Sequence, residues 1–296
     1  MRLLIAGWQG QVARALVELG PAAPDVDAFA VGRPGLDLCE AATITRAMTD
    51  VRPDVIINAA AYTAVDKAES EPEAAFALNR DGARLLAEAA AKRGAALIHV
   101  STDYVFDGSK TAPYAEGDPT APLNVYGRSK LEGEEAVRAA NPRHVIVRTA
   151  WLHSATGTNF VRTMLRLAGE RPSLRVVDDQ VGSPTYAPHL ARALLDIARQ
   201  VSGAQSQSQS PWGTYHIAGS GAVSWCGLAR EIFRVASAQG GPSAEVAAIT
   251  TADYPTPARR PMNSRLDCAK AARVFGVTLP DWREGVSECV SRLLAG

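Results

Sequence analysis

The chain has 296 residues and a mass of 31.3 kDa, which allows one large α/β domain or two unequal ones. Its 31 basic and 31 acidic residues balance, so we expect no nucleic acid and no acidic membrane as partner. The sequence contains no run of 18 apolar residues, so no membrane span is predicted. The apolar stretch of the opening segment is too short for a signal peptide. The four cysteines lack CxxC spacing, which predicts reduced thiols and a cytoplasmic protein.

Short apolar segments alternate with helical patterns through the first half of the chain. Strands are predicted at 3–6, 28–31, 55–57, 96–100 and 145–147, and helices at 12–19, 41–48, 72–93 and 128–140. The strands are continuously hydrophobic, which indicates that both faces of the sheet are covered. We therefore predict an α/β fold, a Rossmann-type doubly wound parallel sheet with helices on each side.

The second half has a different pattern and predicts a smaller C-terminal α/β domain. Residues 200–213 form a polar, low-complexity stretch, typical of an exposed loop without a catalytic role. We expect residues 1–150 to form the first domain and 151–296 mainly the second, with part of 151–200, helix 159–168 included, packing back on the sheet. The other predicted elements are a helix at 187–201, a strand at 174–177, a strand near 214–217, a helix near 224–236, a strand near 246–250 and two closing helices.

A glycine motif follows the first strand directly. Gly7, Gly10 and Ala13 give G-x-x-G-x-x-A at the first strand–helix junction. Glycine allows a tight turn and a close approach to a pyrophosphate, and the start of the helix offers unpaired N–H groups. This position at the head of an alternating strand–helix chain predicts a dinucleotide site.

The end of the second strand bears on the choice of cofactor. An acidic residue there would bind the adenosine ribose hydroxyls and repel a 2′-phosphate, but the chain has Arg33 and no carboxylate before Asp37. A guanidinium suits a 2′-phosphate, so we expect NADPH to be preferred and NADH to be accepted as well. Asp37 and Leu38 would then lie near the adenine.

A tyrosine and a lysine stand four residues apart at the opening of the helix predicted at 128–140. Tyr126 and Lys130 would share one face of that helix. A nearby ammonium should lower the pKa of the phenol and make Tyr126 a usable proton donor. The fourth strand ends with Thr102, whose hydroxyl could hold a carbonyl oxygen beside Tyr126 at the edge where parallel sheets bind ligands.

With these residues, the chain resembles members of the extended short-chain dehydrogenase/reductase superfamily. Within that superfamily it resembles the dTDP-4-dehydrorhamnose reductase family. The resemblance covers nearly the whole chain. It rests on GWQGQVA (7–13), NAAAYTAVDKAESEP (58–72), STDYVFDG (101–108), PLNVYGRSKLEGE (122–134), RTAWL (148–152), NFVRTML (159–165), DDQVGSPT (178–185) and YPTPARRPMNSRL (254–266). It implies NADPH-dependent reduction of the C4 keto group of dTDP-4-dehydro-L-rhamnose, with residues 1–150 binding NAD(P) and 151–296 the substrate.

The resemblance also implies roles for individual residues. Tyr126 would donate the proton, Lys130 would support it and hold the nicotinamide ribose, and Thr102 would tune the transfer. The expected cofactor contacts are Gly7, Gly10, Gln11, Val12, Arg33, Asp37, Leu38, Ala60, Ala61, Tyr62, Tyr126 and Lys130. The expected substrate contacts are Thr102, Asp103 and Trp151 for the deoxysugar, and Arg259 and Arg260 for the diphosphate, because paired guanidiniums suit phosphate.

Two features depart from the family pattern. The third glycine of the motif is Ala13, a tolerated substitution. Some members hold magnesium at a dimer contact through a glutamate in the first helix, where this chain has Ala15. We therefore expect no metal, also because the histidines lack zinc-site spacing, and either a monomer or a homodimer.

Three alternatives share the nucleotide-binding half. A nucleotide-sugar 4,6-dehydratase would need a glutamate after Asp103, where this chain has Tyr104. A 4-epimerase would retain NAD, whereas Arg33 favours an exchanging NADPH. A non-catalytic regulatory subunit, resembling that of methionine adenosyltransferase, would have no need of the complete set of Thr102, Tyr126 and Lys130.

Overall fold

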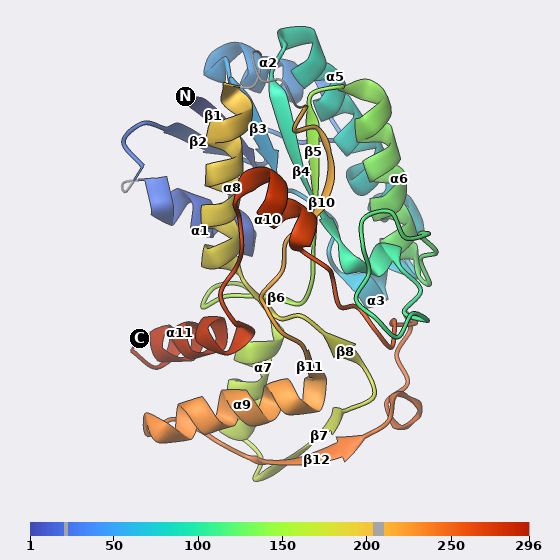
Figure 1. Ribbon diagram of the computed structural model, residues 1–296, viewed down its shortest axis with the longest axis vertical. Coiled ribbons are helices and arrows are strands. Elements are labelled where there is room, and N and C mark those ends of the chain that lie inside the picture. The colour runs from blue at the N-terminus through green and yellow to red at the C-terminus, as the bar shows by residue number, and fades with distance from the viewer. Residues whose placement is uncertain (21–22, 204–209, 296) are drawn as a thin grey trace.

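The computed structural model describes residues 1–20, 23–203 and 210–295. Its centre is a six-stranded sheet in the order β10-β5-β4-β3-β1-β2, seen in the upper half of Figure 1. Every neighbouring pair in this sheet is parallel. The strands are β1 (Arg2–Ala6), β2 (Asp27–Val31), β3 (Val55–Asn58), β4 (Ala96–Thr102), β5 (His144–Thr149) and β10 (Gly213–His216).

Helices cover both faces of this sheet, as the continuous apolar strands predict. Alternate residues of a strand point to opposite faces. Leu3 and Ile5 therefore join the core beneath α1 (Gln11–Leu19), α8 (Ala187–Ser202) and α10 (Ala269–Phe275), whereas Leu4 joins the core beneath α2 (Ala41–Val51), α5 (Ala83–Arg93) and α6 (Val125–Ala140). The doubly wound α/β fold is confirmed.

The helix predicted at 72–93 is helical throughout but contains a widened turn. It consists of α4 (Pro72–Phe76), a π-helical segment η2 (Ala77–Gly82) and α5. The segment lies against α6 at Gly133, where an added Cβ would overlap the carbonyl oxygen of Asn79. Widened turns of this kind are frequent at functional sites, and periodicity alone does not reveal them. The short α3 (Val65–Ala68) precedes α4.

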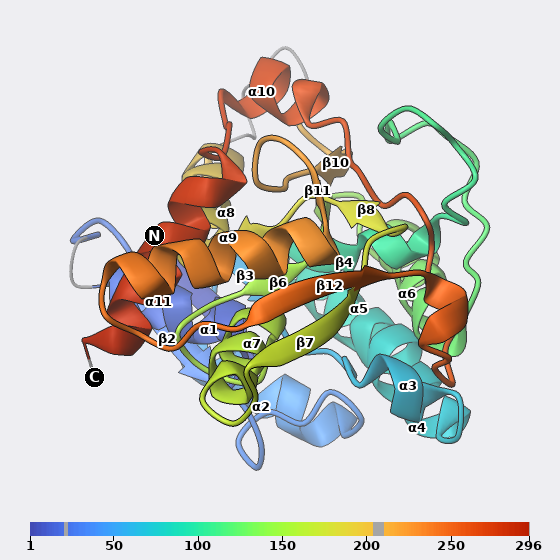
Figure 2. The same ribbon diagram turned by 90° about the horizontal axis from the view of Figure 1, so that it is seen from below.

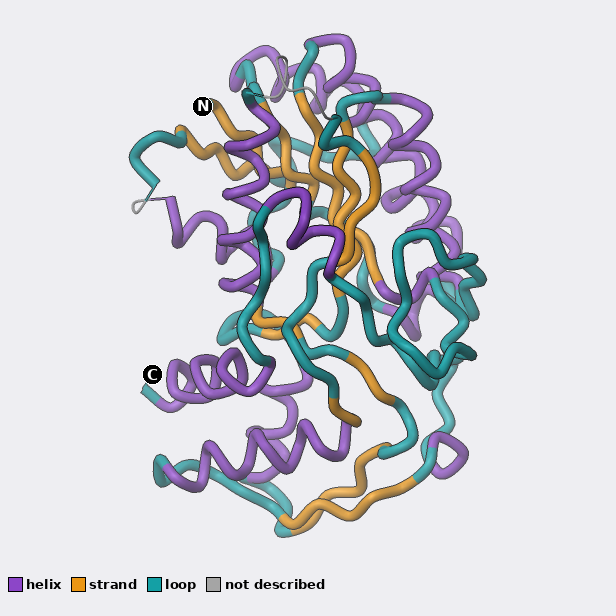
Figure 3. The backbone as a smooth tube through the Cα atoms, in the orientation of Figure 1, coloured by secondary structure: helices purple, strands orange, loops and turns teal. Residues whose placement is uncertain are grey.

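A second lobe lies below the sheet in Figure 1 and faces the viewer in Figure 2. Its core joins α7 (Phe160–Ala168), α9 (Trp225–Ala238) and α11 (Trp282–Leu294) to β7 (Ser173–Val177) and β12 (Glu245–Ile249), which pair in parallel. Figure 3 shows this two-stranded ribbon at the bottom of the molecule, apart from the main sheet. The remaining short elements are η3 (Asp103–Val105), β6 (Leu152–His153), β8 (Val181–Gly182), β9 (Thr185–Tyr186), β11 (Val223–Ser224) and η5 (Thr251–Asp253).

One prediction about the packing of the second half was wrong. Helix 159–168 was expected to flank the sheet, but α7 buries Val161 and Leu165 in the core of the second lobe. The sheet is covered instead by α8, whose Leu190 and Leu194 lie in the core with β1 and β3. Both helices are amphipathic, so the sequence pattern does not say which core each apolar face joins.

The polar stretch 200–213 is only partly a loop. Its first residues continue α8 to Ser202, and its end enters β10. The central residues 204–209 lie outside the described residues. Within the described parts of the chain, no helix is both long and apolar enough to cross a membrane.

Candidate active site

The site is organised around the point where the strand order reverses. From β1 the chain runs to the edge strand β2 and then returns to β3 on the other side of β1. Ligands of open parallel sheets bind outside the carboxyl ends of strands at such a point. Gly7, which follows β1, has a φ of 99°, and an added Cβ would lie 3.4 Å from the backbone nitrogen of Ala60 after β3. Only glycine accepts this conformation without strain.

The start of α1 is shaped to receive an anion. Gly10 is its N-cap, without a side chain that could bond the first N–H groups, and the first turn carries no acidic residue. The amides of Gln11 and Val12 at this helix start have no partner within the helix. The Val12 side chain is buried in the core, so this residue can contribute only its backbone.

The side chain of Gln11 forms hydrogen bonds to the second half of the chain, which the glycine motif does not predict. Its Oε1 accepts hydrogen bonds from Ser154 Oγ at 2.9 Å and from Asn159 Nδ2 at 3.0 Å. Asn159 is the N-cap of α7 and accepts from Arg162 N. The pyrophosphate loop is therefore tied directly to the start of the second lobe.

The segment after β3 is held by side chains of its neighbours. The amide of Ala60 donates to Asn58 Oδ1 at 3.2 Å, and the amide of Tyr62 donates to Asn79 Oδ1 at 2.8 Å. The Tyr62 hydroxyl donates to Glu71 Oε2 at 2.7 Å, and its ring packs with Tyr126 against a small apolar cluster. Ala61 between them is half-buried.

The residues after β2 differ in what they can offer a cofactor. Arg33 is exposed, and the exposed indole of Trp8 lies over Gly32 beside it. The Asp37 carboxylate accepts from Cys39 N at 3.0 Å. The Leu38 side chain, expected near the adenine, is instead buried in the core against Gly82 of η2. An adenine could therefore meet only the backbone of Leu38, because burial has removed its side chain from the surface.

Tyr126 and Lys130 both lie within α6, which begins three residues earlier than predicted. Asn124 caps this helix by accepting from Gly127 N at 2.8 Å, and Glu69, which directly follows α3, accepts from Val125 N at 2.7 Å. These caps were not anticipated, and they place the whole Tyr126–Lys130 turn in helical conformation. Lys130 Nζ donates to Val100 O at 2.7 Å and lies 3.4 Å from His99 Nε2.

The expected effect of Lys130 on Tyr126 is wrong for this structure. Burial raises the pKa of Tyr126 to about 12, and only the hydroxyl of Thr102 acts appreciably in the opposite direction. Burial also lowers the pKa of Lys130 to about 8. The helical spacing correctly places both groups on one face, but the loss of water around each group decides the direction of its pKa shift.

Thr102 and Asp103 occupy the end of β4 next to Tyr126. Thr102 Oγ1 donates to Asp103 Oδ1 at 3.0 Å and accepts from Tyr104 N. Asp103 is 2% exposed, and within the described chain its Oδ2 has no hydrogen-bond partner. Burial raises the pKa of Asp103 to about 7, although the hydroxyls of Thr102 and Ser264 lower it. A buried acceptor without a partner is uncommon and fits a group that awaits a ligand.

The remaining expected substrate residues approach this point from the second half of the chain. Trp151 follows β5, and its Nε1 donates to Ser264 Oγ at 3.0 Å. Asn124 at the start of α6 donates to the carbonyl of Arg259, which brings segment 254–266 beside Tyr126. The Arg259 side chain is exposed, whereas Arg260 pairs with Asp66 of α3 at 2.7 Å. The two arginines therefore differ: a diphosphate would compete with Asp66 for Arg260.

No cation site is evident at this edge. Among the described residues, no group of three or more His, Cys, Asp or Glu is arranged to hold a metal ion. Ala15, where some relatives carry a glutamate, faces the core of α1 and the sheet.

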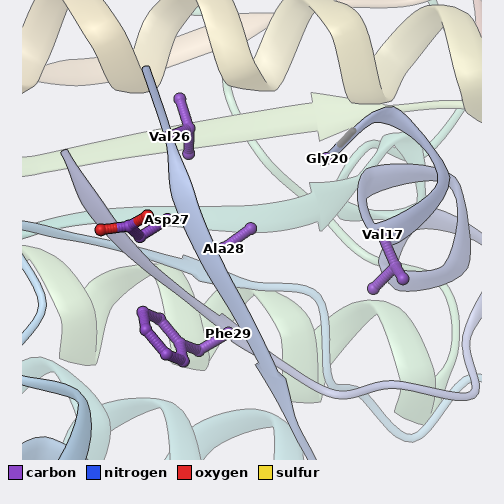
Figure 4. Close-up of a pocket in the computed structure, with 6 residues that line it drawn as sticks. All are labelled: Val17, Gly20, Val26, Asp27, Ala28 and Phe29. Carbon is purple, nitrogen blue, oxygen red and sulfur yellow. The ribbon is translucent and has the colours of Figure 1, made fainter. Parts of the chain in front are cut away.

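A separate surface pocket lies away from these residues. It is formed by the end of α1 and the first half of β2, where Val17 and Phe29 are exposed, as Figure 4 shows. This part of β2 is the amino end of the strand, opposite the edge that carries Gly7 and Thr102. The pocket therefore does not belong to the candidate active site.

Comparison with known proteins places these features in one family. The family model described as RmlD substrate binding domain matches residues 1–295. A dTDP-4-dehydrorhamnose reductase of Sinorhizobium fredii is 51% identical over 99% of this chain and 98% of its own. The chain belongs to the dTDP-4-dehydrorhamnose reductase family.

Solved structures of this family have the same fold. A dTDP-4-dehydrorhamnose reductase from Clostridium acetobutylicum is 36% identical and superposes with a TM-score of 0.90 over 99% of this chain and 100% of its own. Its counterpart from Bacillus anthracis, determined in complex with NADP, is 35% identical with a TM-score of 0.89 over 98% and 99%. The predicted family resemblance is confirmed.

Several residues that hold the candidate site's segments in place were not singled out from the sequence. Asn79 donates to Ser129 Oγ at 2.9 Å and so joins η2 to α6. Glu134, Ser264 and Trp225 are the others, and each acts through a partner more than ten residues away. Glu134 and Ser264 stand inside the quoted motifs PLNVYGRSKLEGE and YPTPARRPMNSRL, which was the only available signal. Trp225 lies in none of the motifs.

Proposed function

We propose that this protein reduces the C4 keto group of dTDP-4-dehydro-L-rhamnose with NADPH, giving dTDP-L-rhamnose in the last step of dTDP-L-rhamnose synthesis. The observation that carries the proposal is the grouping of Thr102, at the end of β4, with Tyr126 and Lys130 of α6, on the same edge of the parallel sheet as Gly7. Membership of the reductase family supports the substrate, and the NADP complex of a relative supports the cofactor.

The residues present fit a dinucleotide phosphate. Gly7 gives close backbone approach, the amides of Gln11 and Val12 would face the pyrophosphate, and Arg33 would meet a 2′-phosphate. Ala60, Ala61 and Tyr62 would line the neighbouring ribose, and Lys130 would hold the nicotinamide ribose. When bound, NADPH supplies the hydride that reduces the ketone.

The protein supplies the proton. With a pKa of about 12, Tyr126 is protonated at neutral pH, which is the state from which a proton donor acts. The O–H bond of Tyr126 breaks as its proton passes to the substrate's O4, which has become an alkoxide, and Tyr126 is left as the phenolate. Thr102, which lowers the pKa of Tyr126, would hold O4 in place and ease this transfer.

The substrate's sugar and diphosphate would bind on the side of the second lobe. Asp103 offers a buried acceptor, Oδ2, that suits a sugar hydroxyl, and Trp151 offers an aromatic face. Arg259 is the better placed of the two arginines for the diphosphate, because the guanidinium of Arg260 is already engaged by Asp66, Thr256 and Ala258.

The dehydratase alternative lacks its characteristic acid/base residue. The position where a dehydratase needs a glutamate holds Tyr104, which is half-buried and packs edge-on against Tyr126, with 5.6 Å between the ring centroids. Burial raises the pKa of Tyr104, so this phenol is poorly suited to act as a base.

We place the enzyme in the cytoplasm as a monomer or homodimer, without a nucleic-acid or membrane partner. The four cysteines Cys39, Cys226, Cys268 and Cys289 are all free, which suits a reducing compartment. The equal numbers of acidic and basic residues give no general attraction to polyanions.

The deciding experiment is a turnover assay. The purified protein is incubated with NADPH and dTDP-4-dehydro-L-rhamnose, and NADPH absorbance and the sugar product are followed together. We expect equal amounts of NADPH consumed and dTDP-L-rhamnose formed, and no reaction with dTDP-glucose, which has no ketone. Folded protein that leaves NADPH unchanged with the ketosugar would contradict the proposal.

A further inference from the structure

Trp151 has an unusual backbone conformation. Its φ is 46°, in the left-handed region that a bulky side chain rarely adopts. Such conformations persist only where the surrounding contacts hold them, and they gather at ligand-binding sites. Trp151 stands where the chain leaves β5 and enters the second lobe, so its contacts join the two halves of the molecule.

Trp225 is the main contact that holds this side chain. The two indole rings are stacked almost parallel, with centroids 3.4 Å apart and an angle of 4° between their planes. Trp225 is the first residue of α9 and packs in turn against Phe160 of α7, at 4.7 Å between centroids. One whole face of Trp151 is therefore covered by an aromatic side chain that is anchored in the second lobe.

The edge of the indole also makes specific contacts. Trp151 Nε1 donates to Ser264 Oγ at 3.0 Å. On the same edge lies Gly182, where an added Cβ would overlap the indole ring. Ser264 also lies close enough to lower the pKa of Asp103, whose other neighbour is Thr102. A line of contacts thus runs from α9 through Trp151 and Ser264 to the end of β4.

We propose that Trp225 and Ser264 are positioning residues, which hold Trp151 in the place where its indole would meet the sugar of the substrate. This inference rests on the proposed function. With one face against Trp225 and its edge against Gly182 and Ser264, the indole is fixed in both position and orientation. Neither positioning residue needs to touch the reacting atoms, because each acts through Trp151.

The test compares substitutions that keep or remove the stacking. Trp225→Leu preserves apolar volume but removes the aromatic face, whereas Trp225→Phe keeps a flat ring. Ser264→Ala removes only the acceptor of the indole N–H. Trp212→Phe is the matched control, because Trp212 packs at the far edge of the sheet against Arg143. For each variant, kcat, the KM for ketosugar, the KM for NADPH and the circular dichroism spectrum are measured.

We expect Trp225→Leu and Ser264→Ala each to raise the KM for the ketosugar by roughly 2- to 12-fold, the range given by one aromatic pair for Trp225 and by one net hydrogen bond for Ser264. The KM for NADPH and kcat should change little, and Trp225→Phe should restore most of the sugar affinity. Closely stacked indoles couple their electronic transitions, so the wild type should show an exciton couplet. Both Trp225 variants should lose it, and Trp212→Phe should retain it.

The possible outcomes separate the two proposals. A wild type that turns over the ketosugar, together with unchanged KM values in Trp225→Leu and Ser264→Ala, overturns the positioning roles and leaves the reductase function intact. A wild type that fails to reduce the ketosugar overturns both. If Trp225→Leu does not fold, the other two variants decide. An unchanged KM for the ketosugar in Ser264→Ala contradicts the inference. An exciton couplet that persists in Trp225→Phe contradicts it as well.

Discussion

The carboxylate of Glu134 is paired with the guanidinium of Arg148 by two hydrogen bonds, 2.9 Å from Nε to Oε1 and 2.7 Å from Nη2 to Oε2. Glu134 is completely buried, one helical turn after Lys130, and its Oε1 also accepts from Ser101 Oγ at 2.6 Å. The pair joins α6, which carries Tyr126, to the ends of β4 and β5. It holds together the elements on which the proposed catalytic groups stand.

Removing the negative charge of this pair should destabilise the fold strongly. Glu134→Gln leaves the buried Arg148 without its counter-charge, and such changes lower the free energy of unfolding by about 3–5 kcal/mol. Glu88→Gln is the control, since Glu88 pairs with Arg84 in an exposed i,i+4 arrangement that contributes only about 0.3–0.5 kcal/mol. Urea unfolding measures both. A similarly small decrease in the free energy of unfolding in both variants would show that the buried pair contributes no more to stability than the exposed one.

Tyr126→Phe should lose turnover while keeping cofactor affinity. The change removes only the hydroxyl that protonates O4, and the ring can still pack with Tyr62. General acid catalysis contributes roughly 10²- to 10⁴-fold, so kcat should fall by that order. Tyr215→Phe removes a buried hydroxyl far from the site, bonded to Pro211 O, and should leave kcat unchanged. A Tyr126→Phe enzyme within about threefold of wild-type kcat would mean that another group gives the proton.

Arg33→Ala should remove most of the preference for NADPH over NADH. One hydrogen bond to a charged group contributes about 1.5–3 kcal/mol, which corresponds to roughly ten- to a hundredfold in kcat/KM. The KM for NADPH should rise and that for NADH should stay nearly constant, because only NADPH carries the 2′-phosphate. Arg46→Ala, an exposed arginine on α2, is the control. Equal KM values for both cofactors in the wild type would show that Arg33 does not meet the phosphate.

Asp103 should make the protein less stable as the pH rises toward neutrality. Its pKa is raised from 3.8 to about 7 by burial, so the folded state holds the proton that the unfolded chain releases. Between these values the folded state binds more protons, and the free energy of unfolding therefore falls as pH rises. This stabilisation is fully present below pH 3.8 and lost by about pH 7. Asp103→Asn cannot ionise and should abolish the fall.

The measurement for Asp103 is urea unfolding of wild type and variant at several pH values. Asp118→Asn is an informative control, because the hydrogen bond from Lys110 lowers the pKa of Asp118. Asp118 therefore contributes stability that is lost as pH falls, the opposite sign. A wild type and an Asp103→Asn variant with parallel pH dependence would contradict the assignment.

Much of the architecture is determined by patterns that involve only neighbouring residues. Apolar runs such as 55–57 and 145–147, followed by helical periodicity, specify the parallel sheet. Gly7 specifies the first turn, because its backbone, with a φ of 99°, is one that residues with a side chain rarely adopt. The four-residue spacing of Tyr126 and Lys130 places both on one helix face wherever the helix packs. These features need no information about distant segments.

Other features were decided only when distant segments came together. The pKa of Tyr126 depends on how much water the surrounding chain excludes, and burial reversed the expected shift. Whether α7 or α8 covers the sheet depends on which core accepts each amphipathic face. The pairing of Arg260 with Asp66, 194 residues apart, and the stacking of Trp151 on Trp225 follow from packing between lobes. Local sequence encodes the elements, but desolvation and long-range contact depend on tertiary structure, because both are properties of the space between elements.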